Sequence, residues 1–346
     1  MGRPSPGRLR GWLRRLAHGL PRRPARKRSP GPDDGIHLSL ETLLGLRTQV
    51  RGLALTPRRA SRARVAGAER AAFRGRGLDF DELRDYQPGD DARSIDWRVT
   101  ARTGRPHTRV YREERERPVW LVVDLRPGMF FATRGAFKSV QAGKAAGLLA
   151  WAAAERGDRV GALLFTDSRY RELTPRGGQR GVLPILRALA DSHVAPERMA
   201  APTSLAVILA RLRRIARPGS LIVLLSDFQG LDYQSEEHLS RLARRHDLTA
   251  VQVYDPLETE PPAPGRYPVS DGVEVAFLDT TRARVREALR EHFSAHQRRV
   301  ADVFTRRHVH VLRLATHNAV WDSVQRVLQA RVRTRRSAPS SRAGAP

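Results

Sequence analysis

The sequence contains no cysteine, which excludes disulfides, thiolate metal ligands and cysteine nucleophiles. No run of about 18 apolar residues is present, the length that a membrane-spanning helix requires. No apolar segment of the signal-peptide type follows the basic first thirty residues, and no Walker A motif occurs anywhere. We therefore expect a cytoplasmic protein without a transmembrane segment, in which any ATP chemistry belongs to a partner.

Lysine is also scarce, because Lys27, Lys138 and Lys144 are the only lysines among 63 basic residues. The net charge of +27 is therefore carried almost entirely by arginine. A compositional bias of the genome explains this as readily as phosphate recognition does, so the arginine content alone predicts no specific ligand.

The positive charge is concentrated at the two ends of the chain. Residues 1–64 carry a net +13 and residues 331–346 a net +5, which leaves +9 for residues 65–330. The ends are rich in Pro, Gly, Ser and Arg and cannot bury much apolar surface, so we predict disordered basic tails at 1–37 and 333–346. Such tails attract polyanions, and nucleic-acid binding through the termini is therefore one alternative function.

Apolar strands alternate with helices from residue 119 to 332, which predicts an α/β domain with a mostly parallel, doubly wound sheet in a three-layer sandwich. The expected strands are 119–123, 159–165, 170–173, 221–225, 248–254, 273–278 and 309–314. The expected helices are 136–156, 178–192, 203–216, 235–245, 281–306 and 319–332. Before this domain, residues 38–118 are expected to hold a helix at 38–55, capped by Ser39, then a connector and a small β/loop segment.

Two aspartates follow directly on buried strands of this pattern. Asp124 ends the run Val-Trp-Leu-Val-Val, and Asp227 follows Leu-Ile-Val-Leu-Leu-Ser. Ligands of open α/β sheets bind beyond the carboxyl ends of the strands, where the strand order reverses. We therefore expect Asp124 and Asp227 to mark the functional edge of the sheet.

The segment from Gly75 to Arg98 is the most distinctive part of the sequence. It contains Gln87-Pro-Gly-Asp90, which predicts a type II turn. Carboxylates interleave with arginines around that turn: Asp79, Asp81, Glu82, Asp85, Asp90, Asp91 and Asp96 with Arg84, Arg93 and Arg98. We favour a structural network of mutually neutralised charges. A metal-dependent hydrolase that uses these carboxylates is the second alternative function.

Arg84-Asp-Tyr-Gln-Pro-Gly-Asp-Asp-Ala-Arg-Ser-Ile-Asp-Trp97, with Thr100-Ala-Arg102 and Glu113-Glu-Arg-Glu-Arg117, resembles the signature of the bacterial "domain of unknown function 58" family. The resemblance extends over about residues 38–320. It implies a von Willebrand factor A-like domain without established enzymatic activity, associated with MoxR-type AAA+ ATPases in the maturation of other proteins. The signature residues are Arg84, Tyr86, Pro88, Gly89, Asp90, Arg93, Asp96 and Trp97.

A-type domains often carry a metal-ion-dependent adhesion site, and the resemblance maps its ligands onto Asp124, Thr203 and Asp227. The two serines of its Asp-x-Ser-x-Ser motif are replaced here by Arg126 and Gly128. Mg²⁺ binding by the three remaining ligands is one interpretation.

We favour a degenerate site in which Arg126 forms an ion pair with Asp124 and replaces the metal. The resemblance then implies a non-enzymatic interaction module without a cofactor, an adaptor for a MoxR-type AAA+ ATPase. Its partners would contact the loop rim of Arg126, Gly128 and Met129. His292 and His296 have a spacing on a helix that can bind zinc, but a solvated helix face explains them better.

Overall fold

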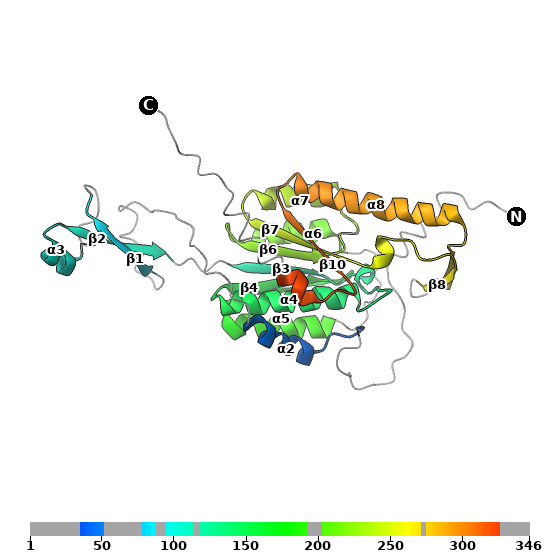
Figure 1. Ribbon diagram of the computed structural model, residues 1–346, viewed down its shortest axis with the longest axis horizontal. Helices are drawn as coiled ribbons and strands as arrows, with labels where there is room; N and C mark the ends of the chain where they lie inside the picture. The colour runs from blue at the N-terminus through cyan, green and yellow to red at the C-terminus, as the bar shows by residue number, and fades with distance from the viewer. Residues whose placement is uncertain are drawn as a thin grey trace, which may run out of the picture. The chain divides into compact units, whose positions relative to one another are not determined.

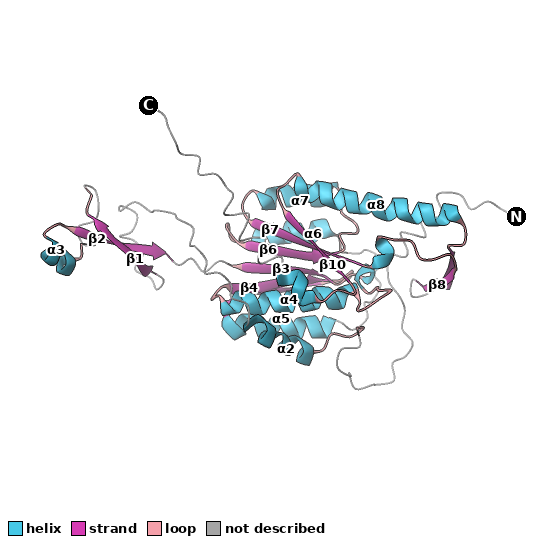
Figure 2. Ribbon diagram, viewed as in Figure 1, coloured by secondary structure: helices cyan, strands magenta, loops and turns pink. Residues whose placement is uncertain are grey.

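The computed structural model describes residues 35–51, 78–87, 95–113, 118–192, 203–270 and 275–325. The chain divides into two compact units, one formed by residues 56–116 and the other by the rest. Figures 1 and 2 show the elements of both. Within the described ranges, no helix combines the length and the apolar character required to cross a bilayer.

A six-stranded sheet forms the centre of the larger unit, in the order β10-β7-β6-β3-β4-β5. All neighbouring strands are parallel except β5, which runs antiparallel to β4 at one edge. The strands are β3 (Val119–Asp124), β4 (Arg159–Phe165), β5 (Tyr170–Gly177), β6 (Leu221–Ser226), β7 (Asp247–Tyr254) and β10 (His310–Ala315). Since β3, the first of them in the chain, lies between β4 and β6, the strand order reverses at β3, as in doubly wound folds. The predicted mostly parallel sheet is confirmed.

The expected strand at 273–278 exists, but it does not join this sheet. As β9 (Val275–Asp279) it pairs antiparallel with β8 (Arg266–Ser270) in a separate hairpin. Leu278 is buried and clusters with Leu289 of a neighbouring helix, whereas Phe277 is 56% exposed. The exposure of Phe277 next to the buried Leu278 suits a surface hairpin better than a central parallel strand, which is buried on both faces.

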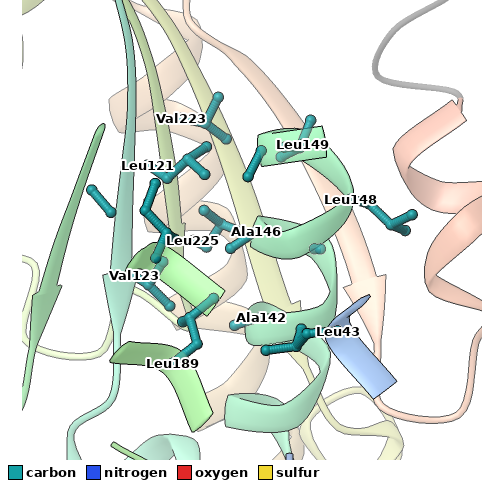
Figure 3. Close-up of a cluster of buried hydrophobic side chains, with 14 of the residues drawn as sticks. Leu43, Leu121, Val123, Ala142, Ala146, Leu148, Leu149, Leu189, Val223 and Leu225 are labelled. Carbon is teal, nitrogen blue, oxygen red and sulfur yellow. The ribbon is translucent and has the colours of Figure 1, made fainter. Parts of the chain in front are cut away.

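One face of the sheet is covered by α4 (Lys138–Glu155) and α5 (Gly178–Ser192), and α2 (Leu40–Arg51) packs on the outer side of these helices, as Figure 1 shows. Figure 3 shows part of the apolar cluster between these helices and the sheet, including Leu43, Leu121, Ala146 and Leu225. Burial of such side chains stabilises the fold by roughly 1.5–3 kcal/mol each.

Helix α2 lies against a stripe of small residues on α4. A Cβ atom at Gly143 would stand 2.3 Å from Leu38, and one at Gly147 would stand 2.9 Å from Leu43. The Trp151 indole donates a hydrogen bond to the Leu43 carbonyl at 3.1 Å. The helix therefore belongs to the larger unit, not with the signature segment in a separate region 38–118.

The other face is covered by α6 (Leu205–Ile215), α7 (Tyr233–Ala243) and α8 (Ala283–Thr305). Their apolar side chains form a second cluster against the sheet, in which the Phe228 and Phe304 rings meet edge to face at 4.9 Å. The sheet thus lies between two helical layers. Of the helix expected at 319–332, residues 320–325 are helical and the remainder lies outside the described residues.

The smaller unit consists of β1 (Leu78–Asp85), α3 (Trp97–Thr103) and β2 (His107–Glu113). The two strands pair antiparallel, with an irregularity between Phe80 and Glu82. Helix α3 begins after Asp96 and ends at Gly104, whose φ of 70° is a left-handed conformation that glycine adopts readily.

Candidate functional site

Arg126 and Asp124 form a bidentate ion pair at the carboxyl end of β3. Arg126 Nε donates to Asp124 Oδ1 at 2.9 Å, and Arg126 Nη2 donates to Asp124 Oδ2 at 2.6 Å. The Arg126 backbone N–H adds a third hydrogen bond to Oδ1 at 3.1 Å. The Asp124 side chain is fully buried, whereas that of Arg126 is 16% exposed. The expected ion pair is present.

The loop after the neighbouring strand β6 completes this arrangement. Ser226 Oγ donates to Asp124 Oδ2 at 2.6 Å and accepts a hydrogen bond from the Phe228 N–H at 2.9 Å. Phe228 has φ 57°, uncommon for a residue other than glycine. The chain turns sharply there, and the Gln229 carbonyl accepts a hydrogen bond from Arg126 Nη2 at 3.0 Å. Arg126 thus joins the loops that follow β3 and β6.

A second buried cation, Lys138, neutralises Asp227. Lys138 Nζ lies 2.8 Å from Asp227 Oδ2 and 2.9 Å from Glu258 Oε1, and its side chain is only 3% exposed. Asp227 Oδ1 accepts the Gln229 N–H at 3.0 Å. Lys138 begins α4 and Glu258 lies in the short helix η4 (Pro256–Glu258) after β7, so one ammonium group joins three parts of the chain.

Asp255 fixes the segment that supplies Glu258. Its carboxylate is fully buried and accepts hydrogen bonds from the Thr133 N–H and hydroxyl, the Leu257 N–H and the Thr316 hydroxyl. Glu258 in turn accepts the Asp255 N–H at 3.0 Å, which completes a capping box. The second acid beside Lys138 is therefore held by a preorganised network.

The electrostatics keep these groups charged. Burial alone would lower the pKa of Lys138, but Asp227 and Glu258 raise it above its usual range. Burial alone would likewise lower the pKa of Arg126. The attraction of Asp124 outweighs this effect and raises the pKa of the guanidinium. Burial would raise the pKa of Asp227, but Lys138 and then Arg126 hold it below its ordinary value. All these shifts follow from ion pairing in a region of low dielectric.

The residues present do not fit the divalent cation that the resemblance implies. Mg²⁺ requires oxygen ligands in near-octahedral geometry. Both oxygens of Asp124 accept hydrogen bonds from Arg126, and Lys138 and Gln229 engage those of Asp227. The Thr203 hydroxyl, the third matching ligand, donates to the Asp167 carbonyl at 3.0 Å. Two fixed cations thus stand where a metal would have to bind.

The loop rim differs from the expected one. Gly128 and Met129 lie in the short helix η3 (Pro127–Met129) and are buried, and Met129 packs in the apolar cluster beneath it. The 3₁₀ turn directs this segment inward, which the sequence pattern does not reveal. The loops after β3, β4 and β6 are exposed at other positions: Thr133, Arg134, Gly135, Ser168, Arg169, Gly230 and Asp232.

The signature segment lies in the smaller unit. Asp96 is its clearest structural residue, since it accepts hydrogen bonds from the Arg98 and Val99 N–H groups at the start of α3. Trp97 is 67% exposed and Tyr86 is half-buried, while Arg84 lies in β1 opposite Thr108. The remaining signature residues, Pro88, Gly89, Asp90 and Arg93, lie outside the described residues, as does the expected turn.

No three His, Cys, Asp or Glu side chains of the described residues are placed to hold a metal ion together. Most carboxylates of the acidic signature lie outside the described side chains, among them Asp79, Asp81, Asp90 and Asp91. Asp85 pairs with His107 at 3.4 Å. His296 forms a hydrogen bond through Nε2 with the Asp227 carbonyl at 2.9 Å, so it ties α8 to the carboxyl edge of the sheet. Burial and then His296 lower the pKa of His292.

Sequence reasoning missed Lys138, Ser226, Asp255 and Glu258 as members of the site. One signal was available for Lys138, because a lysine is rare in this chain and this one stands in an otherwise apolar helix. Its ammonium group is a compact point charge with three donors, which here binds two carboxylates at once. Nothing in the local sequence distinguishes Glu258 from a solvated glutamate.

The family model described as "Protein of unknown function DUF58" matches residues 82–300. "Uncharacterized protein Rv1480" of Mycobacterium tuberculosis (strain ATCC 25618 / H37Rv) is 33% identical over 254 residues, which cover 72% of this chain and 77% of that protein. "Uncharacterized protein MAV169" of Mycobacterium avium is 32% identical over 130 residues, covering 36% of this chain and 73% of that protein.

Among solved structures, the chain is similar to the conserved hypothetical protein BatB from Bacteroides thetaiotaomicron. The TM-score is 0.40 at 12% identity, covering 64% of this chain and all of that one. An aerotolerance-related membrane protein from Bacteroides fragilis gives a TM-score of 0.39 at 11% identity, covering 63% of this chain and 99% of that chain.

Proposed function

The chain belongs to the DUF58 family, and we propose that it is a non-enzymatic interaction module with a von Willebrand factor A-like domain. In this proposal it acts in the cytoplasm as an adaptor for a MoxR-type AAA+ ATPase during the assembly or maturation of other proteins. The adaptor role follows from the family resemblance of the signature at residues 84–97.

The observation that carries the proposal is the internal neutralisation of the carboxyl edge. Under the proposed A-type fold, Asp124 and Asp227 correspond to metal ligands, and each is paired with a buried cation of the chain itself. Acid–base catalysis requires a carboxyl group that can take up or release a proton near the working pH. Lys138 holds the pKa of Asp227 well away from that range. A carboxyl edge of this kind is better suited to bind a partner through a rigid surface than to transfer protons.

The ATPase would contact the exposed loops around this edge. Arg134 follows β3 and Arg169 follows β4, and both side chains are exposed. Beneath them, Arg126 and Lys138 join the loops after β3, β6 and β7. In this proposal, the ion pairs of Arg126 and Lys138 fix the geometry of the loops that a partner would recognise.

Direct binding between the purified chain and a MoxR-type ATPase from the same genome tests this proposal, with and without ATP and Mg²⁺. The informative variant is Arg134→Glu/Arg169→Glu, which reverses two exposed charges at the carboxyl edge. Arg217→Glu/Arg244→Glu is the matched control, because these exposed arginines precede β6 and β7 at the opposite edge.

We expect the carboxyl-edge variant to weaken binding by at least about tenfold, while the control changes it by less than about threefold. Absence of binding in the wild type, or an equal loss in both variants, would contradict the proposed surface. Circular dichroism of both variants checks that each is folded.

Of the alternatives, nucleic-acid binding through the termini concerns residues outside the described ranges and stays a prediction. A hydrolase built on the acidic signature is less favoured, because Asp96 is engaged as the N-cap of α3 and Asp85 faces His107.

A further inference from the structure

A solvent-open groove of about 490 Å³ is lined by residues of α7 and of the C-terminal half of α8. Four arginines line it, all from α8 or the turn that follows: Arg298, Arg299, Arg306 and Arg307. Glu236 and Ser240 of α7 and Asp302 of α8 contribute the other polar groups. With four cations and two anions, this α7–α8 groove carries a formal charge of +2.

Two of the arginines are held by the protein itself. Arg307 Nε donates to Ser240 Oγ at 2.7 Å, and Arg307 Nη1 donates to the Val303 carbonyl at 2.6 Å. Arg307 and Arg299 share Glu236, at 3.5 and 3.3 Å. One carboxylate therefore neutralises only part of the charge on that wall of the groove, and it fixes the two arginines in position.

The other two arginines, Arg298 and Arg306, are exposed. In the described part of the chain, neither has an acidic side chain within 4 Å or a side-chain hydrogen bond, although Asp302 lies between them on the helix. They are eight residues apart, which corresponds to about 12 Å along the helix axis. Two exposed guanidinium groups thus line the groove, with the single carboxylate of Asp302 four residues from each on the same helix.

We propose that the α7–α8 groove binds an acidic helical segment of a partner protein, with carboxylates of that segment pairing with Arg298 and Arg306. Guanidinium binds carboxylate in a bidentate geometry, and two carboxylates about two helical turns apart would reach both arginines. Ala295 also lines the groove, and its small side chain leaves room for the backbone of such a segment.

The distribution of charge favours an acidic polypeptide over nucleic acid. Glu236 and Asp302 interrupt the row of arginines, and a continuous chain of phosphates would have to pass both. An acidic segment can instead place neutral residues opposite these two carboxylates and acidic ones opposite Arg298 and Arg306. None of the lining residues belongs to the loops that follow β3, β4 and β6, so the inference does not depend on the ATPase-adaptor proposal.

Fluorescence anisotropy on the full-length chain tests the inference with three labelled probes. These are a helical peptide with two glutamates eight residues apart, the same peptide with glutamine in their place, and a single-stranded DNA oligonucleotide. The groove variant is Arg298→Glu/Arg306→Glu. Its control is Arg214→Glu/Arg284→Glu, which changes the net charge equally at exposed arginines of α6 and α8 that do not line the groove.

We expect the glutamate peptide to bind the wild type, and to bind the groove variant at least about tenfold more weakly but the control less than about threefold. The glutamine peptide should not bind measurably. Equal weakening in the two variants would overturn the inference, since it would indicate attraction by net charge alone. Absence of peptide binding, or a groove-dependent binding confined to DNA, would overturn it as well.

Discussion

Replacing Lys138 by methionine would remove the one cation between Asp227 and Glu258 while nearly conserving the side-chain volume. At the observed separations of 2.8 and 2.9 Å, each attraction amounts to about 6 kcal/mol at an effective dielectric constant of about 20. The free-energy cost of desolvating the ammonium group offsets much of these two attractions, and the methionine variant does not have that cost. Breaking a buried pair by removing one partner costs about 3–5 kcal/mol, and we expect Lys138→Met to fall in that range.

Urea unfolding followed by circular dichroism measures this loss, since urea, unlike guanidinium, does not screen charges. Lys144→Met is the matched control, because Lys144 lies on the same helix but is half-exposed, and we expect it to cost less than about 1 kcal/mol. The triple variant Lys138→Met/Asp227→Asn/Glu258→Gln should recover part of the loss, because it removes the two uncompensated carboxylates. A cost below about 1 kcal/mol for Lys138→Met, or equal costs for both lysines, would refute the reasoning.

Three further predictions follow from the same geometry. The lowered pKa of Asp227 contributes stability that is present above its unfolded value of about 3.9 and is lost as the pH falls through the lower folded value. Asp227→Asn should therefore flatten the acid side of a stability–pH profile, and an unchanged acid side would contradict the assignment. Arg126→Ser restores an oxygen ligand beside Asp124, so calorimetry should detect Mg²⁺ binding in this variant but not in the wild type; equal binding in both would refute the replacement of the metal. Leu43→Ala should lower the free energy of unfolding by about 2–5 kcal/mol because Leu43 is fully buried against α4, whereas Leu44→Ala, at a 41% exposed position of the same helix, should have little effect.

Much of the larger unit was predictable from local pattern. Strands that are buried on both faces, such as β3 and β6, are uninterrupted apolar runs, and this pattern is visible without any knowledge of tertiary contacts. The pair of Arg126 and Asp124 was predictable for a similar reason. The two residues are two positions apart at the end of a strand, so no distant part of the chain has to be placed to bring them together.

Tertiary structure alone decided the rest. Lys138, Asp227 and Glu258 are far apart in sequence and meet only because the strands that precede them end at the same edge of a parallel sheet. The segment at β9 has the composition of a core strand, but its place in the hairpin depends on contacts with α8. Met129 was expected on the loop rim, but it packs in the apolar cluster, and this too depends on tertiary contacts. The sequence by itself determined which segments are strands and helices, because that depends on local periodicity; which charges are neutralised depends on distances across the fold, which only the packed chain defines.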